Sequence, residues 1–558
     1  MDPRLKIIIH GKPEEELSLL MRLNDASKYP MQTKVVTQFG DIVTCRIKRK
    51  NIFEVYNSKE VKSLKAPTVI PAVTVSQNDS SVIYNEVQKK SLPIQKSNVV
   101  FGIIDFGFDF THADFIDDGK TRFEKIWVQS GNYDNNNYGY GKIIDSDDLN
   151  DALQDDFPFK KVAYHPGASD LFGAGTHGTH VLGIACSNGS VAKKAYASNS
   201  PIIAVDMGSN YVNGSNLSLG DSVKLVEGLD FLLKEAKGRP IVINMSLGGH
   251  GDSHTGKTLV EQAIDQILVN RKGTAIVQSV GNYHVAKAHT YGCIKQNEKI
   301  KIPWLFKKND QTPNELEIWY EGNDMMSVII YDENNIKLIE TVPFKDEIIS
   351  LNNIEIGICL HRKNEPNTGK NQIDIILNGK LNSKYFFIEL VGKKIIKGNY
   401  HCYIERDDNG QSIFDAKFIK QTHTTNSICN SFFGISVGAY NQDEVEKNIL
   451  NFSSSGPTVD GRMKPEVLAP GNKIISSCSS SSIDNKATRK LCSKSGSSMA
   501  SPYVASLIIK ILEKQPQLNI FEIRKKLLQS CDPFVSKDKN LEIFRAGNGY
   551  VNPNKIII

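Results

Sequence analysis

Four continuous apolar runs in this chain lack the polar alternation of a half-exposed strand. They lie at residues 98–105, 201–207, 239–247 and 273–280. Such runs are typical of parallel strands that are covered on both faces. Residues 219–237 and 256–270 lie between or beside them and carry apolar side chains at helical spacing. The pattern therefore predicts an α/β domain with a doubly wound, mainly parallel sheet.

The α/β rhythm stops near residue 290 and resumes at 432–441, before the helices that follow Ser498. The intervening segment contains short strand-like runs separated by turn residues. They lie at 299–304, 315–320, 326–332, 371–378, 384–392 and 399–406. Runs of this length and spacing predict an all-β domain, a sandwich or jelly roll, inserted at 290–429. The α/β domain then consists of 98–289 and 430–558.

The first 75 residues show a different pattern, which predicts a small α+β domain of the ferredoxin-like, split-βαβ type. Its expected order is β-α-β-β-α-β. The predicted elements are a strand at 4–10, a helix at 13–27, two strands within 33–48 that turn at Gly40-Asp41, a helix at 51–66 and a strand at 67–73. Residues 76–97 have low apolar density and are interpreted as a linker.

Composition narrows the class of protein. The 558 residues are 40% hydrophobic and 23% charged, which is ordinary for a multidomain globular chain. The net charge of +5 is scattered, so no nucleic-acid partner is expected. No apolar stretch reaches the roughly 18 residues of a membrane span, and no signal peptide is recognised. Nine cysteines without a CxxC pair favour reduced thiols, so a cytoplasmic location is expected.

Two polar residues stand just where buried strands end. Asp105 closes the run 98–105, and Asn282 follows the run 273–280. Catalytic groups gather at this edge of an open parallel sheet, and a side-chain amide there can donate to a developing oxyanion. Taken alone, Asp105 is equally well explained as a loop-opening residue, and Asn282 as part of a common turn.

His177 and His180 lie in a glycine-rich stretch that opens a helix. Residues 173–178 fit the spacing G-x-G-x-x-G, and Asp206 ends a later strand, so a dinucleotide-binding site is an alternative interpretation. That fingerprint needs a strand directly before it, whereas the preceding residues are turn-like. A metal site on the two histidines lacks a helical Glu partner. His180 is better explained as a helix residue with local hydrogen bonds.

Ser498 follows Gly496 at the start of an apolar helix. Backbone amides at a helix N-terminus stabilise negative charge, which suits a nucleophilic serine. Ser497 could serve as an N-cap, and Ser501 would already point along the helix. Asp105, His177 and Ser498 follow one another in an order known for the Ser-His-Asp triad.

Four sequence motifs contain these three residues and Asn282 and follow one another along the chain. They are IIDFGFDFTHADF from 103, HGTHVLGIA from 177, SVGN from 279 and SGSSMASPYVA from 495. Two further ones are INMSLGG from 243 and FSSSGPTVDGRMKPEVLAPG from 452. In these motifs the chain resembles the subtilase family of serine peptidases, over about 95–290 and 430–555. The resemblance implies Asp105 as orienting acid, His177 as general base, Ser498 as nucleophile and Asn282 as oxyanion donor. It also implies a substrate-binding strand at Ser246, Leu247 and Gly248.

Three residues depart from the usual family pattern: Phe106, Thr176 and Ser497. None of them removes a group that the chemistry needs. Subtilases commonly carry a small propeptide that templates folding and inhibits until it is cut. Some, including clostridial spore germination proteases, carry a jelly-roll insert in a similar place. The resemblance therefore implies a serine endopeptidase, made as a zymogen that processes its own N-terminal domain.

The expected partners are a protein or peptide substrate and the chain's own N-terminal domain, with no membrane partner. The chemistry requires no cofactor and no metal. A catalytically silent pseudoprotease that acts as a binding or signalling module is the alternative, and transpeptidation would use the same acyl-enzyme. The sequence assigns no structural calcium site and does not decide the oligomeric state.

Overall fold

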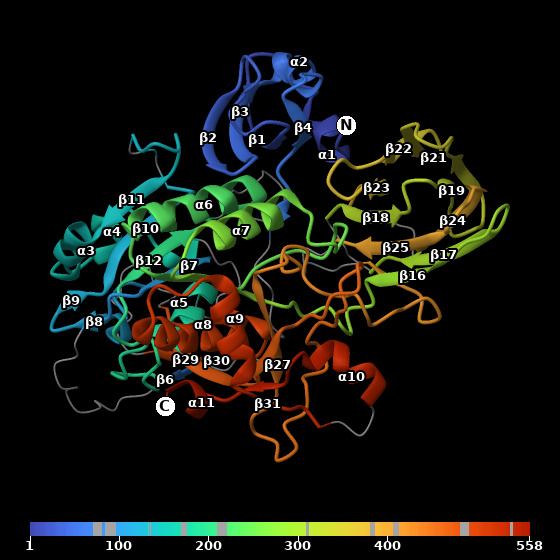
Figure 1. Cartoon of the computed structure of the whole chain (residues 1–558). Coiled ribbons are helices and arrows are strands. Elements are labelled where there is room, and N and C mark those ends of the chain that lie inside the picture. The colour runs from blue at the N-terminus through green and yellow to red at the C-terminus, as the bar shows by residue number, and fades with distance from the viewer. Residues whose placement is uncertain are drawn as a thin grey trace.

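The computed structural model describes residues 1–70, 81–83, 96–131, 133, 135–168, 176–208, 220–307, 312–379, 385–405, 412–479, 490–535 and 539–557. The chain forms three parts (Figure 1). They are an N-terminal domain (1–70), an α/β domain (96–288 and 415–557) and an insert of strands (289–414). Among the described helices, none combines the length and the hydropathy that a bilayer crossing requires.

A ten-stranded sheet forms the centre of the α/β domain, in the order β11-β10-β12-β7-β14-β15-β27-β28-β32-β31. Neighbours from β10 to β32 run parallel, and the edge strands β11 and β31 run antiparallel. The strands are β7 Val100–Asp105, β10 Phe123–Val128, β11 Lys142–Asp145, β12 Ile202–Asp206, β14 Ile241–Met245, β15 Thr274–Ser279, β27 Ile435–Tyr440, β28 Val467–Pro470, β31 Cys531–Asp532 and β32 Tyr550–Val551. The predicted mainly parallel sheet is confirmed, and the four apolar runs become β7, β12, β14 and β15.

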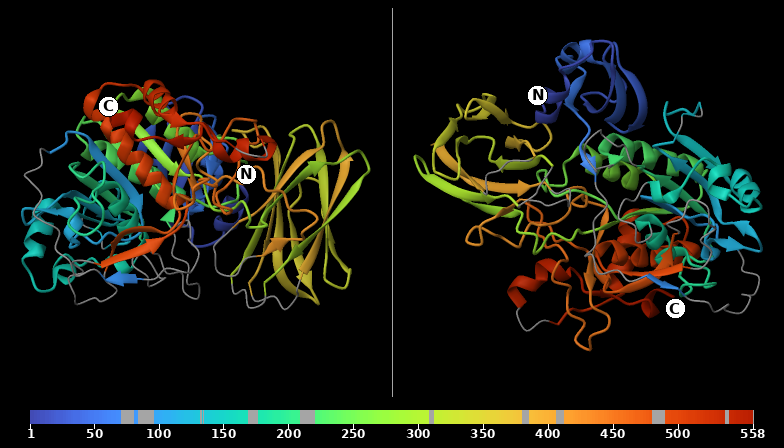
Figure 2. Two further views of the ribbon diagram at one scale, coloured as in Figure 1. Left: turned by 90° about the horizontal axis from the view of Figure 1, so that it is seen from below. Right: turned by 180° about the vertical axis from the view of Figure 1, so that it is seen from behind.

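Helices cover the sheet from both sides, as Figures 1 and 2 show. Helices α6 (Ser222–Glu235) and α7 (Leu259–Asn270) lie on the side of the N-terminal domain, and α5 (His177–Cys186) and α8 (Ser497–Lys514) lie on the other. Asp221 caps α6, and a Thr258–Glu261 capping box starts α7. Helix α8 packs against β14, β15, β27 and β28 and is buried along most of its length. The remaining helices are α3 Ser146–Leu153, α4 Pro158–Lys161, α9 Ile520–Gln529, α10 Lys539–Ala546 and α11 Asn554–Ile557.

The N-terminal domain is an antiparallel four-stranded sheet in the order β2-β3-β1-β4. Its elements are α1 Pro3–Ile8, β1 Glu16–Leu23, β2 Lys34–Phe39, β3 Ile42–Lys48, α2 Ile52–Tyr56 and β4 Val61–Lys65. The predicted hairpin at 33–48 is confirmed, with its turn at Gly40, whose φ is +59°. The sheet lies on helices α6 and α7 of the α/β domain.

The predicted β-α-β-β-α-β order was wrong. Residues 3–8 form a helix instead of a strand, because Asp2 caps it by accepting from the Leu5 N–H and Pro3 stands at its first position. The segment predicted as a helix at 13–27 contains β1, which pairs with β3 on one edge and β4 on the other. The predicted helix at 51–66 is short and gives way to β4. Of the predicted closing strand at 67–73 the structure describes residues 67–70, in which Val69–Ile70 form β5.

The insert consists of two antiparallel sheets that share one hydrophobic core. One sheet has the order β16-β25-β18-β23-β22-β21, and the other has the order β20-β19-β24-β17-β26. Their strands are β16 His289–Cys293, β17 Lys299–Leu305, β18 Asn314–Tyr320, β19 Met325–Tyr331, β20 Lys337–Glu340, β21 Glu347–Leu351, β22 Ile354–Arg362, β23 Asn371–Leu377, β24 Tyr385–Lys394, β25 Asn399–Ile404 and β26 Ile413–Phe414. Residues such as Trp304, Ile318 and Phe386 fill the space between the sheets.

Two short strands connect the N-terminal part of the chain to the α/β domain. Strand β5 pairs with β13 (Gly220–Asp221) at the start of α6. Strand β6 (Ser81–Ile83) pairs with β30 (Lys490–Lys494), which forms a hairpin with β29 (Ile474–Cys478). Most of the predicted linker at 76–97 lies outside the described residues.

Candidate active site

Three of the predicted site residues stand at the ends of elements that meet in the α/β domain. Asp105 is the last residue of β7, His177 is the first residue of α5, and Ser498 is the second residue of α8. Helices α5 and α8 pack against each other, and α5 also contacts β7. The fold therefore brings together elements that are up to about 400 positions apart in the sequence.

Asp105 and His177 form a buried pair. The Nδ1 atom of His177 lies 2.6 Å from Oδ1 of Asp105, and this oxygen also accepts from the Phe106 N–H at 2.7 Å. This contact occupies Nδ1 of His177, so Nε2 lies on the side of the ring that points away from Asp105. This is the arrangement of an acid that orients a general base.

A close backbone approach makes this pair possible. The Gly178 N–H donates to the Phe106 carbonyl at 2.8 Å, so α5 begins directly against the loop that follows β7. A Cβ at position 178 would lie 2.9 Å from the carbonyl oxygens of Phe106 and Gly107. Gly107 has a φ of +73°, and its own Cβ would meet Thr176. Glycine is therefore needed at both positions to bring His177 to Asp105.

Ser498 is fully buried at the N-terminus of α8. Its Oγ donates to the Ser246 carbonyl at 3.4 Å, and the Ser246 hydroxyl donates back to the Ser498 carbonyl at 3.0 Å. A second contact holds the two segments together, because the Ser501 hydroxyl donates to Asn244 at 2.6 Å. The serine therefore lies between the start of α8 and the segment that follows β14.

Asn282 faces the same helix terminus. Its Oδ1 accepts from both the backbone N–H and the hydroxyl of Ser497, at 3.0 Å each. The side-chain amide is planar, so these contacts turn Nδ2 to the side away from Ser497. Ser497 is not the N-cap considered from the sequence, since α8 has no side-chain cap and the Ser497 hydroxyl contacts Asn282 and Gly281 instead.

The segment Ser246, Leu247 and Gly248 follows β14 and runs beside the serine. Asn426 donates from Nδ2 to the Leu247 carbonyl at 2.7 Å, and the Tyr283 hydroxyl donates to the Gly248 carbonyl at 2.9 Å. Gly248 has a φ of +143°, and a Cβ there would lie 2.1 Å from Asn426. These contacts fix the carbonyls of the segment, each of which keeps a second lone pair for a peptide N–H.

Sequence reasoning missed two residues that shape this region. Asn426 is fully buried and donates to both Leu247 and Ser279, so it joins the segment after β14 to the end of β15. Tyr283 adds the contact to Gly248. Asn426 lies against Gly248, but the two residues are far apart in the sequence, so the sequence alone does not indicate that they are in contact.

The insert reaches the same segment from outside. Glu405 accepts from the backbone N–H groups of His250 and Gly251, at 2.8 and 2.9 Å, and Glu317 accepts from that of Asp252 at 3.0 Å. Three consecutive amides directly after Ser246–Gly249 are thus held by two carboxylates of the insert. This support could not be predicted from any motif in the sequence.

His180 is a buried residue of helix α5, but the expected local hydrogen bonds of its side chain were wrong, since its partners lie on strands β29 and β30. Its Nε2 lies 3.0 Å from the Ile474 carbonyl and 3.1 Å from the Cys492 carbonyl, and burial lowers its pKa to about 3. Within the described ranges no cluster of three or more His, Cys, Asp or Glu side chains is arranged to hold a metal. The glycine-rich residues 169–175 lie outside the described part of the chain. Asp206, the acid of the dinucleotide alternative, accepts from the Tyr164 hydroxyl and the Gly208 N–H.

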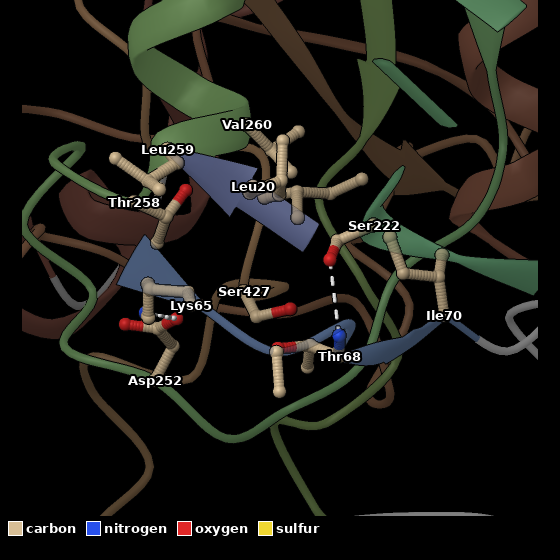
Figure 3. A pocket seen from close by; sticks show the side chains of 12 residues that line it. Leu20, Lys65, Thr68, Ile70, Ser222, Asp252, Thr258, Leu259, Val260 and Ser427 are labelled. Atoms are coloured by element: carbon tan, nitrogen blue, oxygen red, sulfur yellow. Dashed lines mark hydrogen bonds and ion pairs between the residues drawn. The ribbon is translucent and has the colours of Figure 1, made fainter. Parts of the chain in front are cut away.

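A cavity lies apart from these residues, between the N-terminal and α/β domains (Figure 3). Thr68 and Ser222 are linked across it, since the Thr68 N–H donates to the Ser222 hydroxyl at 3.0 Å. Lys65 lies 3.7 Å from Asp252 on its other side. None of the predicted site residues lines it, so it belongs to the domain interface.

Comparison with known proteins agrees with this geometry. The pattern of the subtilase family matches residues 96–549. Serine protease AprX of Bacillus subtilis is 34% identical over 128 residues, which are 21% of this chain and 28% of AprX. The minor extracellular protease Vpr of the same organism is 22% identical over 522 residues, which are 88% of this chain and 54% of Vpr. The chain thus spans about a quarter to a half of these curated relatives.

Among solved structures, the CspB protease of Clostridium perfringens covers 83% of this chain and 94% of its own, with a TM-score of 0.68 and 24% identity. This likeness shows a shared fold. The family pattern extends over most of the sequence, from before β7 to the end of the α/β domain. The chain belongs to the subtilase family of serine proteases.

Proposed function

We propose that this chain is a serine endopeptidase that cleaves peptide bonds through an acyl-enzyme on Ser498. The observation that carries the proposal is the buried 2.6 Å contact between Asp105 and His177, on elements that pack against helix α8, whose second residue is Ser498. Incubation with a mixture of unstructured peptides, followed by mass spectrometry, tests it. New peptide ends are expected with the wild-type chain, and intact peptides at high enzyme concentration would contradict the proposal.

The proposed chemistry uses three side chains. Ser498 Oγ attacks the scissile carbonyl carbon while Nε2 of His177 takes its proton, and Asp105 stabilises the resulting imidazolium. The tetrahedral intermediate collapses when His177 returns the proton to the leaving amine, which breaks the C–N bond. A water molecule then gives a proton to Nε2 of His177 and attacks the carbonyl carbon of the acyl-enzyme. His177 passes this proton to Oγ of Ser498 as the ester C–O bond breaks, which frees the serine.

The oxyanion would be held by Asn282 and by the backbone at the start of α8. The contacts of Oδ1 to Ser497 support this role, because they hold the Asn282 side chain beside the start of α8. Donors that are fixed before the reaction stabilise developing charge without reorganisation. The segment Ser246, Leu247 and Gly248 would bind an extended peptide through its backbone.

Asn282→Ala is expected to lower kcat by about 10²–10³ with little change in KM, since this donor acts mainly in the transition state. Steady-state kinetics on one peptide substrate measures both parameters. Asn282→Asp, which keeps the size and loses the donor, should show the same loss. A change confined to KM in both variants would mean that Asn282 only shapes the turn.

The N-terminal domain is proposed to be a propeptide that the enzyme cuts. Two observations support this. Strand β5 follows the domain and pairs with β13, and β6 pairs with β30, only a few residues before Ser498. The segment that joins the domains is therefore anchored at the start of α6 and again on the strand that precedes Ser498. We retain the expected cut between residues 72 and 97.

Self-processing predicts two fragments from the wild-type chain and a single chain of full mass from Ser498→Ala. Intact-mass spectrometry of the two purified proteins measures this. A cut that also occurs in Ser498→Ala would assign it to another protease, and an uncut but fully active wild type would make the N-terminal domain a permanent part of the enzyme.

The alternative functions predict different products from the same experiments. A pseudoprotease would bind peptides and leave every peptide bond intact. A transpeptidase would transfer the acyl group to an added amine, so ligated or cyclised peptides would appear beside hydrolysed ones. The proposed endopeptidase gives hydrolysed products in the absence of an added amine.

A further inference from the structure

The outer face of one insert sheet carries buried carboxylates. Glu315 and Glu317 lie on β18, and Asp374 lies on β23 directly opposite Glu317 in the strand register. Their neighbours Leu316 and Ile318 belong to the insert core, so the carboxylates point out of the sandwich. Glu317 and Asp374 are nevertheless only 5% and 1% exposed. With Glu405 they form what we call the acidic pocket.

A cation from another domain enters this pocket. Nη2 of Arg4, on helix α1 of the N-terminal domain, lies 2.6 Å from Oε2 of Glu315. The four carboxylates of the acidic pocket all raise the pKa of Arg4, which keeps its guanidinium charged. Arg4 and Glu315 retain only 19% and 15% of their side-chain exposure. The guanidinium is therefore largely removed from water and surrounded by acids.

The carboxylates need this cation. Neither carboxylate oxygen of Asp374 accepts a hydrogen bond from a donor within the described residues. Burial, followed by the charge of Glu315, raises the pKa of Asp374. Burial, followed by the charge of Asp252, also raises the pKa of Glu317. The charge of Arg4 acts in the opposite sense on the pKa of both carboxyl groups, so the guanidinium favours their ionised forms at a place where a carboxylate without a compensating charge is strongly destabilising.

The remaining contacts of α1 are complementary to the same sheet. Lys6 lies 2.8 Å from Asp346 and donates to the His361 carbonyl at 2.6 Å. In a further ion pair the insert supplies the cation and the N-terminal domain the carboxylate, since Arg362 lies 3.4 Å from Asp2. Helix α1 also packs against β22. The first eight residues of the chain thus dock on the insert with opposite charges facing each other.

We propose that the acidic pocket is a guanidinium-binding site of the insert, that Arg4 is its occupant, and that this contact holds the N-terminal domain on the insert. The guanidinium suits the site, because one of its donors meets Glu315 directly while the charges of the other three carboxylates act on it. The insert is accordingly a second docking surface for the N-terminal domain, in addition to helices α6 and α7. The proposal concerns binding alone and holds whether or not the chain is a protease.

Hydrogen exchange of the full chain tests the proposal. All variants carry Ser498→Ala, so that the chain stays intact whether or not it processes itself. Arg4→Ala is expected to speed exchange at least about tenfold in α1 and in β18 and β23, since removing one partner leaves buried charges unpaired. Lys12→Ala, which removes an exposed cation close to α1, is the matched control and should change little.

Chemical rescue identifies the ligand class. Millimolar guanidinium chloride should slow exchange again in Arg4→Ala, whereas sodium chloride or calcium chloride at equal ionic strength should not. Equal rescue by sodium chloride would reduce the contact to general screening, and rescue by calcium alone would make the pocket a cation site of another kind. Either result overturns the proposal.

A second variant covers the case in which Arg4→Ala does not fold. Glu315→Gln keeps the side-chain volume and removes the direct partner of Arg4, so α1 should exchange several-fold faster while the strands of the α/β domain do not. Unchanged exchange in α1 in a folded Glu315→Gln or Arg4→Ala chain would overturn the proposal.

Discussion

Ser498→Ala is expected to lower kcat for peptide hydrolysis by about 10⁶-fold, because without the hydroxyl no acyl-enzyme forms. The fold should tolerate the change, since the Oγ of Ser498 makes one long contact, to Ser246. Steady-state kinetics with a fluorogenic peptide measures the loss, and thermal unfolding verifies that the variant is folded.

The matched control for this variant is Ser506→Ala. Ser506 lies on the same helix, and its hydroxyl donates only to the Tyr503 carbonyl within that helix. The activity of Ser506→Ala should stay close to that of the wild type. Comparable activity in Ser498→Ala would assign the nucleophile to another residue and would overturn the proposed mechanism.

Asp105→Asn is expected to lower kcat by about 10⁴-fold with little change in KM. An amide at this position would donate to Nδ1 of His177, so the imidazole would adopt the tautomer whose Nε2 carries the proton and cannot accept one from Ser498. The buried geometry should persist, because the Asn side chain has nearly the same shape.

Kinetics on the same peptide measures this effect, with Asp118→Asn as the control in an exposed loop shortly after β7. A loss of less than about tenfold in Asp105→Asn would show that the contact of 2.6 Å to His177 serves structure and not catalysis.

The α/β domain could be predicted because its strands are buried on both faces. The strands β7 and β14 are buried along their whole length, and their sequences lack the polar alternation of a half-exposed strand. Once they are placed in parallel, Asp105 and Asn282 must fall at the same edge of the sheet. The motifs around His177 and Ser498 then complete the candidate site.

The N-terminal domain could not be predicted in the same way. Its opening isoleucines favour a strand by local propensity, yet capping by Asp2 and burial of Leu5 make a helix. The acids and leucines at 13–27 favour a helix, whereas pairing with β3 and β4 makes β1 a strand. In both places tertiary contacts outweigh small differences in intrinsic propensity.

The contacts that support the candidate site also could not be predicted from the sequence. Asn426 meets Leu247 across 179 positions, and Glu405 meets His250 across 155. Neither residue stands in a motif, and the segment around Glu405 was assigned to a separate domain. Such partners become visible only when the insert and the α/β domain are seen side by side (Figure 2).

Labelling of the wild-type chain with a serine-directed fluorophosphonate, followed by peptide mapping, tests the central claim most directly. The account predicts a single modified residue, Ser498, and loss of labelling when His177 is replaced by alanine, because the hydroxyl is then no longer activated. Absence of labelling in a folded, processed wild-type chain, or labelling at Ser497 or Ser495 in place of Ser498, would contradict it.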